Sequence, residues 1–105
     1  MAYYLVRALP RKGRMRVLEE KLELEVFDPI RPFGSAMAES LRRARVDEEG
    51  RVWWEEEDYC SPPLAEEREA VLDHYFTKIE VEQVAEGLGW KEIEDLPRLF
   101  PEQSS

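Results

Sequence analysis

The pattern of apolar and polar residues along the chain predicts a small α+β domain. Residues 2–9 are apolar at both odd and even positions, which is typical of a central strand buried on both faces. Residues 10–13 then supply proline and glycine for a turn. Residues 77–84 alternate apolar and charged side chains and predict a half-buried strand, and residues 51–55 predict a shorter one.

The segment of residues 14–27 fits two patterns. Over residues 22–27, apolar side chains alternate with Glu23 and Glu25, which favours a strand. A helix is the alternative, because apolar side chains also recur at helical spacing: Met15, Leu18, Leu22 and Val26. We favour the strand, because the preceding turn would then close a hairpin with the first strand.

Two helices are predicted between the strands. Ser35 can cap the first, whose apolar face would consist of Met37, Leu41 and Ala44. Ser61 can cap the second, with Pro62 at its first position. Two glycines in residues 85–89 predict a hairpin loop into a last strand at residues 90–94.

These elements combine into one two-layer α+β domain over residues 1–100. We expect a mainly antiparallel sheet of four to five strands with two helices on one face, in the order ββαβαββ. Residues 101–105 are expected to form a frayed tail. No apolar run reaches the ~20 residues that a membrane span needs, and no signal-peptide pattern is present. We therefore expect a soluble cytoplasmic protein without a membrane partner.

Composition adds two points. The single cysteine fits a reducing compartment, and the absence of asparagine beside many Glu and Arg residues is a thermophile-like balance. The net charge of −9 makes nucleic acid an unlikely partner. The charge is uneven: residues 1–46 carry ten Lys/Arg and six Asp/Glu (+4), and residues 47–105 carry five and eighteen (−13).

The basic first half contains a candidate anion-binding cluster around the first turn. Its members are Arg11, Lys12, Arg14 and Arg16, and Arg42, Arg43 and Arg45 are candidates to join them. Such a cluster could bind a phosphate or an acidic protein segment.

Residues 50–63 contain the strongest local signal. Trp53 and Trp54 are neighbours on a predicted strand, so they face opposite sides of the sheet and one should enter the core. An outward tryptophan near Arg51 and Tyr59 has the composition of an interaction hot spot. Our leading hypothesis is a binding module that self-associates, most simply as a dimer, through the surface around Trp53 and Trp54.

The acidic run at residues 55–58 supports weaker hypotheses. Side chains alternate faces on a strand, so only Glu55 with Glu57, or Glu56 with Asp58, can converge. We expect a solvated charge run and assign neither a metal nor a cofactor. An alternative is a small enzyme or ligand-binding domain with a carboxylate-lined pocket, so enzymatic activity stays an open question.

Two further hypotheses involve the acidic half of the chain. A regulator that binds a basic partner surface would require residues 47–69 and 80–94 to merge into one patch. Cys60 precedes a predicted helix start, which would lower its thiol pKa and suit a nucleophile. Its candidate base, His74, lies about 20 Å further along the same predicted helix, so we expect a structural cysteine.

Overall fold

A computed structural model describes residues 2–101 and places an antiparallel sheet at the centre of the molecule, with strand order β2-β3-β1-β4. The strands are β1 (Ala2–Pro10), β2 (Arg45–Val46), β3 (Val52–Asp58) and β4 (Phe76–Val84). The helices are α1 (Met15–Glu23), α2 (Gly34–Arg42), α3 (Ala65–Ala70), the 3₁₀ turn η1 (Leu72–His74) and α4 (Leu88–Glu92). The predicted α+β class with a mainly antiparallel sheet is confirmed. Of the predicted tail, residues 102–105 lie outside the described part of the chain.

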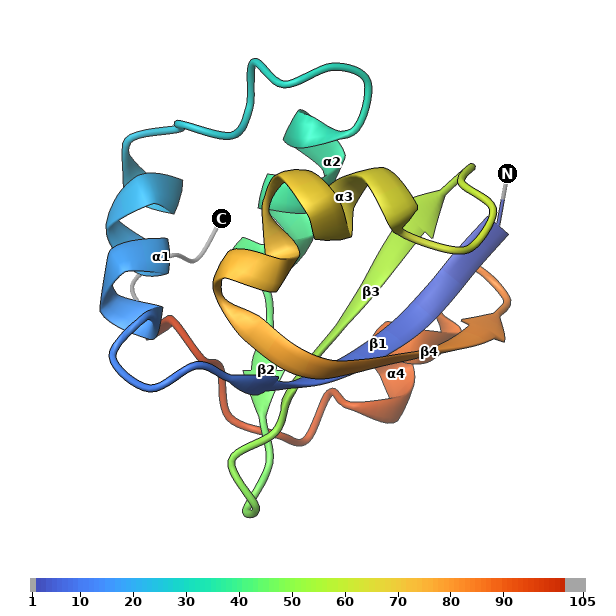
Figure 1. Cartoon of the computed structure of the whole chain (residues 1–105). Helices are drawn as coiled ribbons and strands as arrows, with labels where there is room; N and C mark the ends of the chain where they lie inside the picture. The colour runs from blue at the N-terminus through green and yellow to red at the C-terminus, as the bar shows by residue number, and fades with distance from the viewer. Residues whose placement is uncertain (1, 102–105) are drawn as a thin grey trace.

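Strand β1 lies in the middle of the sheet, as its two apolar faces predict. Val6 pairs with Trp54 on β3 and with Val81 on β4. Helices α1, α2 and α3 lie on one side of the sheet, here called the inner face, and α4 lies on the other, the outer face (Figure 1). The short helix on the outer face is a departure from the predicted arrangement of two helices on a single face.

The main core fills the space between the inner face and the three helices. Trp54 is fully buried there, and its ring centroid lies 5.1 Å from that of Phe76. Fully buried aliphatic side chains surround this pair: Val6, Leu18, Met37, Leu41, Val52, Leu64 and Leu72. The burial of these apolar side chains is the main source of the free energy of folding in a small domain.

The strand predicted at residues 22–27 is wrong, because this part of the chain continues and then ends helix α1. Leu18 and Leu22, four residues apart, are both buried on one side of the helix. Leu24 and Val26, which made the alternation look like a strand, are 72% and 46% exposed. Strands β3 and β4 occupy both sides of β1, so no hairpin partner is needed.

The last predicted strand, at residues 90–94, is also wrong. Residues 88–92 form α4, which begins after Gly87 at a φ of +84°. The hairpin reading depended on glycines that here permit the turn into a helix. The Glu55 side chain of β3 holds the helix to the sheet, as described below. The pattern of apolar residues within 85–94 could not predict this tertiary contact.

Both predicted serine caps are wrong. Phe33 precedes α2 and Leu64, at a φ of +63°, precedes α3, and neither helix has a side-chain cap. The second predicted helix is shorter than expected, because Val71 leaves the helical region (φ −137°, ψ −59°). The chain then makes the η1 turn and enters β4 at Phe76.

Candidate functional site

The acidic run at the end of β3 is largely buried, so the expectation of a solvated charge run at residues 55–58 is wrong. Glu55 is 4% exposed, Glu56 is 1% exposed and Asp58 is 5% exposed. The register of β3 sends Glu55 and Glu57 to the outer face and Glu56 and Asp58 to the inner face, as alternation predicts. Buried carboxylates require hydrogen-bond or charge partners, and these partners differ between the two faces of the sheet.

On the outer face, Glu55 holds α4 in place. Its carboxylate accepts hydrogen bonds from the backbone N–H groups of Gly87 (2.8 Å), Gly89 (2.7 Å) and Trp90 (3.2 Å). Those N–H groups begin the helix and have no partner within it, and the positive end of the helix favours a negative charge. These three hydrogen bonds satisfy the buried Glu55 carboxylate, whose role is to hold α4 against the sheet.

On the inner face, Glu56 and Asp58 converge with Glu67 of α3. Asp58 Oδ2 accepts hydrogen bonds from the backbone N–H groups of Cys60 (3.1 Å) and Leu64, which fixes the loop between β3 and α3. Glu56 Oε1 accepts one from the indole N–H of Trp54 at 2.8 Å. Glu67 is 0% exposed although it lies on a surface helix. Three carboxyl groups thus meet at the edge of the core.

Burial and hydrogen bonding shift the pKa values of all three carboxyl groups. Burial, reinforced by Asp58, raises the pKa of Glu67 to about 7. Burial also raises the pKa of Glu56 well above its usual range, in spite of the hydrogen bond from Trp54. Burial alone would raise the pKa of Asp58, but hydrogen bonds from Leu64, Glu67 and Cys60 outweigh it and lower that pKa. The raised pKa values of Glu56 and Glu67 thus favour their protonated forms, and the lowered pKa of Asp58 favours its charged form.

A cavity of about 200 Å³ opens beside these carboxyl groups. Asp58, Cys60 and Glu67 line it, Glu57 and Glu66 border it, and the rest of the lining is an apolar wall: Pro32, Phe33, Ala36 and Tyr59. We call this cavity, with Glu56 behind it, the carboxylate pocket. One oxygen each of Glu56 and Glu67 (Oε2 in both) is buried without an N–H, hydroxyl or thiol donor among the described residues, so a proton can reach it only from another carboxyl group of the cluster. An oxygen in that state favours a proton or another positive group.

Cys60 belongs to this pocket, and it is not activated as a nucleophile. A backbone hydrogen bond at Glu66 favours the thiolate, but burial and the carboxyl groups of Asp58 and Glu67 outweigh it and raise the thiol pKa. His74 lines a different cavity beside Pro62 and Pro63, and the helix expected to join the two residues is interrupted at Val71. The lowered thiol pKa expected from a helix start is thus wrong.

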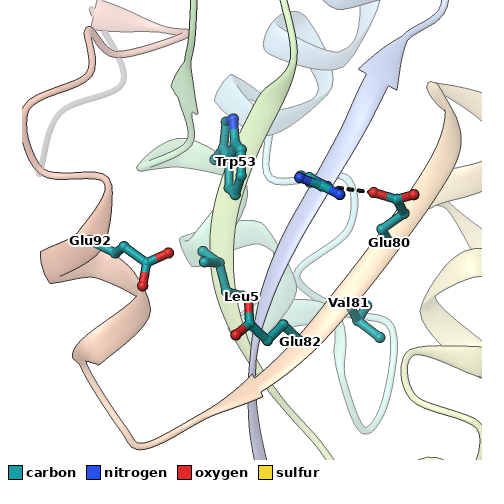
Figure 2. Close-up of a pocket in the computed structure, with 7 residues that line it drawn as sticks. Leu5, Trp53, Glu80, Val81, Glu82 and Glu92 are labelled. Atoms are coloured by element: carbon teal, nitrogen blue, oxygen red, sulfur yellow. Dashed lines mark hydrogen bonds and ion pairs between the residues drawn. The ribbon is translucent and has the colours of Figure 1, made fainter.

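Trp53 lies on the outer face, in a second candidate site. Its indole N–H donates to Asp47 Oδ2 at 2.8 Å, and the Arg7 guanidinium lies 5.7 Å from its ring centroid. Figure 2 shows a groove that runs from Trp53 and Glu92 across Leu5 toward β4. Arg7 and Glu80 also line this groove and form an ion pair. We call this the outer groove; it is about 260 Å³ in volume.

The structure separates the four predicted interaction residues. Trp54 is the tryptophan that enters the core, and Trp53 remains half-buried. Arg51 lies near Trp53 and contacts Glu49 at 3.8 Å. Tyr59 is 72% exposed, but it borders the carboxylate pocket and not the outer groove.

The predicted anion-binding arginines contact the protein itself. Arg11 donates to the backbone carbonyl of Asp73 at 2.8 Å, and Arg14 donates to that of His74 at 3.3 Å. Arg16 lies beside three acidic residues of α1, and Lys12 is exposed. The other candidates point elsewhere: Arg42 pairs with Asp28 and Arg45 donates to the carbonyls of Glu94 and Leu96. Anion binding by this cluster stays a prediction.

Glu67 is the site residue that sequence reasoning missed. It looked like one of two acids favouring a helix start. Its burial could have been predicted from its spacing: Leu64 and Val71 lie three and four residues away, so all three share one helical face. A glutamate within an apolar helical stripe indicates a buried carboxyl group.

Comparison with known proteins finds no matching family model, and neither a curated protein nor a solved structure matches the chain significantly. Within residues 2–101, every helix falls short of the length and apolarity required to cross a membrane.

Proposed function

We propose that this protein is a ligand-binding domain whose carboxylate pocket binds a small cation. The observation that carries the proposal is the pair of buried carboxyl oxygens, on Glu56 and Glu67, that no N–H, hydroxyl or thiol donor among the described residues satisfies. Within residues 2–101, their only polar neighbours are the other carboxyl groups of the cluster. Glu67 lines a cavity large enough for a small ligand, and Glu56 hydrogen-bonds Glu67. The proposal includes a cytoplasmic location, where a single thiol such as Cys60 stays reduced.

Several features of the pocket support a cation over an anion. Asp58 and Glu67 supply oxygen acceptors, and no Lys, Arg or His side chain is among the lining residues. The apolar wall of Phe33 and Pro32 lowers the local dielectric and strengthens the attraction between a carboxylate and a bound positive charge. The raised pKa values of Glu56 and Glu67 favour bound protons, and these protons would leave as a cation enters.

The test is a titration of isotope-labelled protein with divalent metal ions, small alkylamines and guanidinium, followed by NMR. We expect one of these cations to shift backbone signals concentrated in residues 56–67. Glu67→Gln should abolish the response, and Glu69→Gln, on the exposed side of the same helix, should leave it unchanged. Responses that are absent, or spread equally over the exposed acids, would contradict the proposal.

A second candidate function is self-association through the outer face and the edge of β4. The edge at β2 is covered by the C-terminal segment, since Val46 N–H donates to Pro97 and Leu99 N–H donates to Ala44. Strand β4 pairs only with β1 among the described strands. An open edge next to the outer groove is a surface on which a second copy could add its own strand.

The charges on β4 favour a particular register for this pairing. In an antiparallel pair of β4 strands centred on Glu80, Lys78 of each copy faces Glu82 of the other. The two Glu80 side chains face each other in this register, and each is neutralised by its ion pair with Arg7 of its own chain. We expect a dimer by light scattering at micromolar concentration. Glu82→Lys should convert it to a monomer, and the double swap Lys78→Glu with Glu82→Lys should restore the dimer. A wild-type monomer in both low and high salt would rule out self-association.

A further inference from the structure

We propose that Asp58, Cys60 and Glu67 form a site for a thiophilic divalent metal ion of the Zn²⁺ class. This inference rests on the proposed cation-binding function and names the kind of cation. No metal was assigned from the sequence, because only two side chains of the acidic run can converge on one face of a strand. The residues of the proposed site come instead from the end of β3, the following loop and α3.

The three side chains are close enough to share one ion. One ligand atom from each, namely a carboxylate oxygen of Asp58, the Cys60 sulfur and a carboxylate oxygen of Glu67, lies within 4.8 Å of the other two. Cys60 Sγ lies 3.7 Å from Glu67 Oε1. Tetrahedral zinc with a sulfur at about 2.3 Å and an oxygen at about 2.1 Å separates these two ligands by about 3.6 Å. The widest separation in the cluster must contract by about 1 Å.

An independent observation points to a ligand at this position. The Glu67 side chain is fully buried, lines the cavity, and has one oxygen, Oε2, that no N–H, hydroxyl or thiol donor among the described residues satisfies. Only neighbouring carboxyl groups are left to share a proton with it, and a bound cation would replace that proton. The two N–H groups that bind Asp58 Oδ2 hold that carboxylate in place beside Cys60 and Glu67. Glu56 lies behind Glu67 and is held by Trp54, so it acts as an outer partner that positions the ligands.

The sulfur of Cys60 determines the class of metal. Oxygen ligands alone would suit Mg²⁺ or Ca²⁺, which need six or more of them. One thiolate with two carboxylates suits zinc and its neighbours, since Zn²⁺ accepts both donor types. Three protein ligands leave a fourth position for water or for a ligand entering the cavity.

The experiment uses the full chain after metal removal with a chelator. Zn²⁺ is titrated by calorimetry, and Co²⁺ is added as a spectroscopic probe of thiolate coordination. We expect one Zn²⁺ per chain, an absorption band from the bond between Co²⁺ and the Cys60 thiolate, and at least about tenfold weaker Zn²⁺ binding by Cys60→Ser. Glu67→Gln should also weaken binding, and Glu69→Gln should not.

The outcomes separate this inference from the proposed function. If Cys60→Ser binds Zn²⁺ as tightly as the wild type, or if only amines or Mg²⁺ bind in the pocket, the zinc-class site is wrong and the cation pocket stands. If no cation binds there, both fail. The Co²⁺ band is measured on the wild-type protein, so a variant that does not fold cannot produce a false result; absence of that band overturns the inference.

Discussion

At the scale of single residues, the two neighbouring tryptophans have opposite roles. Trp54 is fully buried against Phe76, whereas Trp53 is half-buried on the outer face, with its indole N–H bonded to Asp47. Alternation along a strand predicted that one ring would enter the core, and it could not say which. The choice depends on which face the helices cover, a property of the whole fold.

Because the two tryptophans are buried to different extents, replacing them with alanine should lower the free energy of unfolding by different amounts. Trp54→Ala should lower the free energy of unfolding by about 3–5 kcal/mol, because it leaves a large cavity in the core. Trp53→Ala should lower it by about 1 kcal/mol, since it removes one hydrogen bond and a half-exposed surface. Urea unfolding of both variants measures the difference. Equal losses would contradict the burial described for these two side chains.

At the scale of elements, predictions succeeded where one local pattern determined the structure. The central strand β1, the strand β4 and the helix α2 follow from patterns of burial along the chain. Helix α1 was missed because residues 14–27 satisfied two periods at once. Helix α4 was missed because its start is bound by Glu55, thirty-two residues before Gly87.

Helix α4 therefore provides a prediction about Glu55. Replacing it with Ala removes three hydrogen bonds to the start of α4 and should cost roughly 2 kcal/mol of stability. Hydrogen exchange at the N–H groups of Gly89 and Trp90 should accelerate more than exchange in β1. Glu57→Ala, on the same face of β3, is the matched control and should leave α4 exchange unchanged. Loss of protection throughout the molecule would contradict a local role.

At the scale of the whole molecule, burial divides the acidic charge of the second half. Glu55, Glu56, Asp58 and Glu67 are buried, so they cannot contribute to an acidic patch for a basic partner. The sequence could predict that Glu56 and Asp58 share a face. It could not predict that Glu67 closes the cluster, because that depends on how the loop after β3 folds back.

The buried acids predict how stability depends on pH. The pKa of Glu67 is about 7 in the folded protein against an ordinary 4.5, so the folded state binds more protons than the unfolded state between these values. The free energy of unfolding should therefore fall as pH rises from about 4.5 to about 7, by at most about 1.4 kcal/mol per pH unit for one proton. The raised pKa of Glu56 acts in the same direction.

The lowered pKa values of Asp47 and Asp58 act at the acid end, where stability is lost as pH falls through them. Urea unfolding with a chelator present, across about pH 5 to 8, tests the decline. Glu67→Gln should flatten it, and Glu69→Gln should keep it. A wild-type stability that rises over this interval would show that Glu67 is not buried as a carboxylic acid.

The proposed zinc-class site in the carboxylate pocket is tested most directly by a crystal structure grown with Zn²⁺ and recorded at the zinc absorption edge. We predict one strong anomalous peak at about 2.0–2.3 Å from the Cys60 sulfur and from carboxylate oxygens of Asp58 and Glu67. Peaks confined to exposed acids, with an empty pocket, would contradict the account.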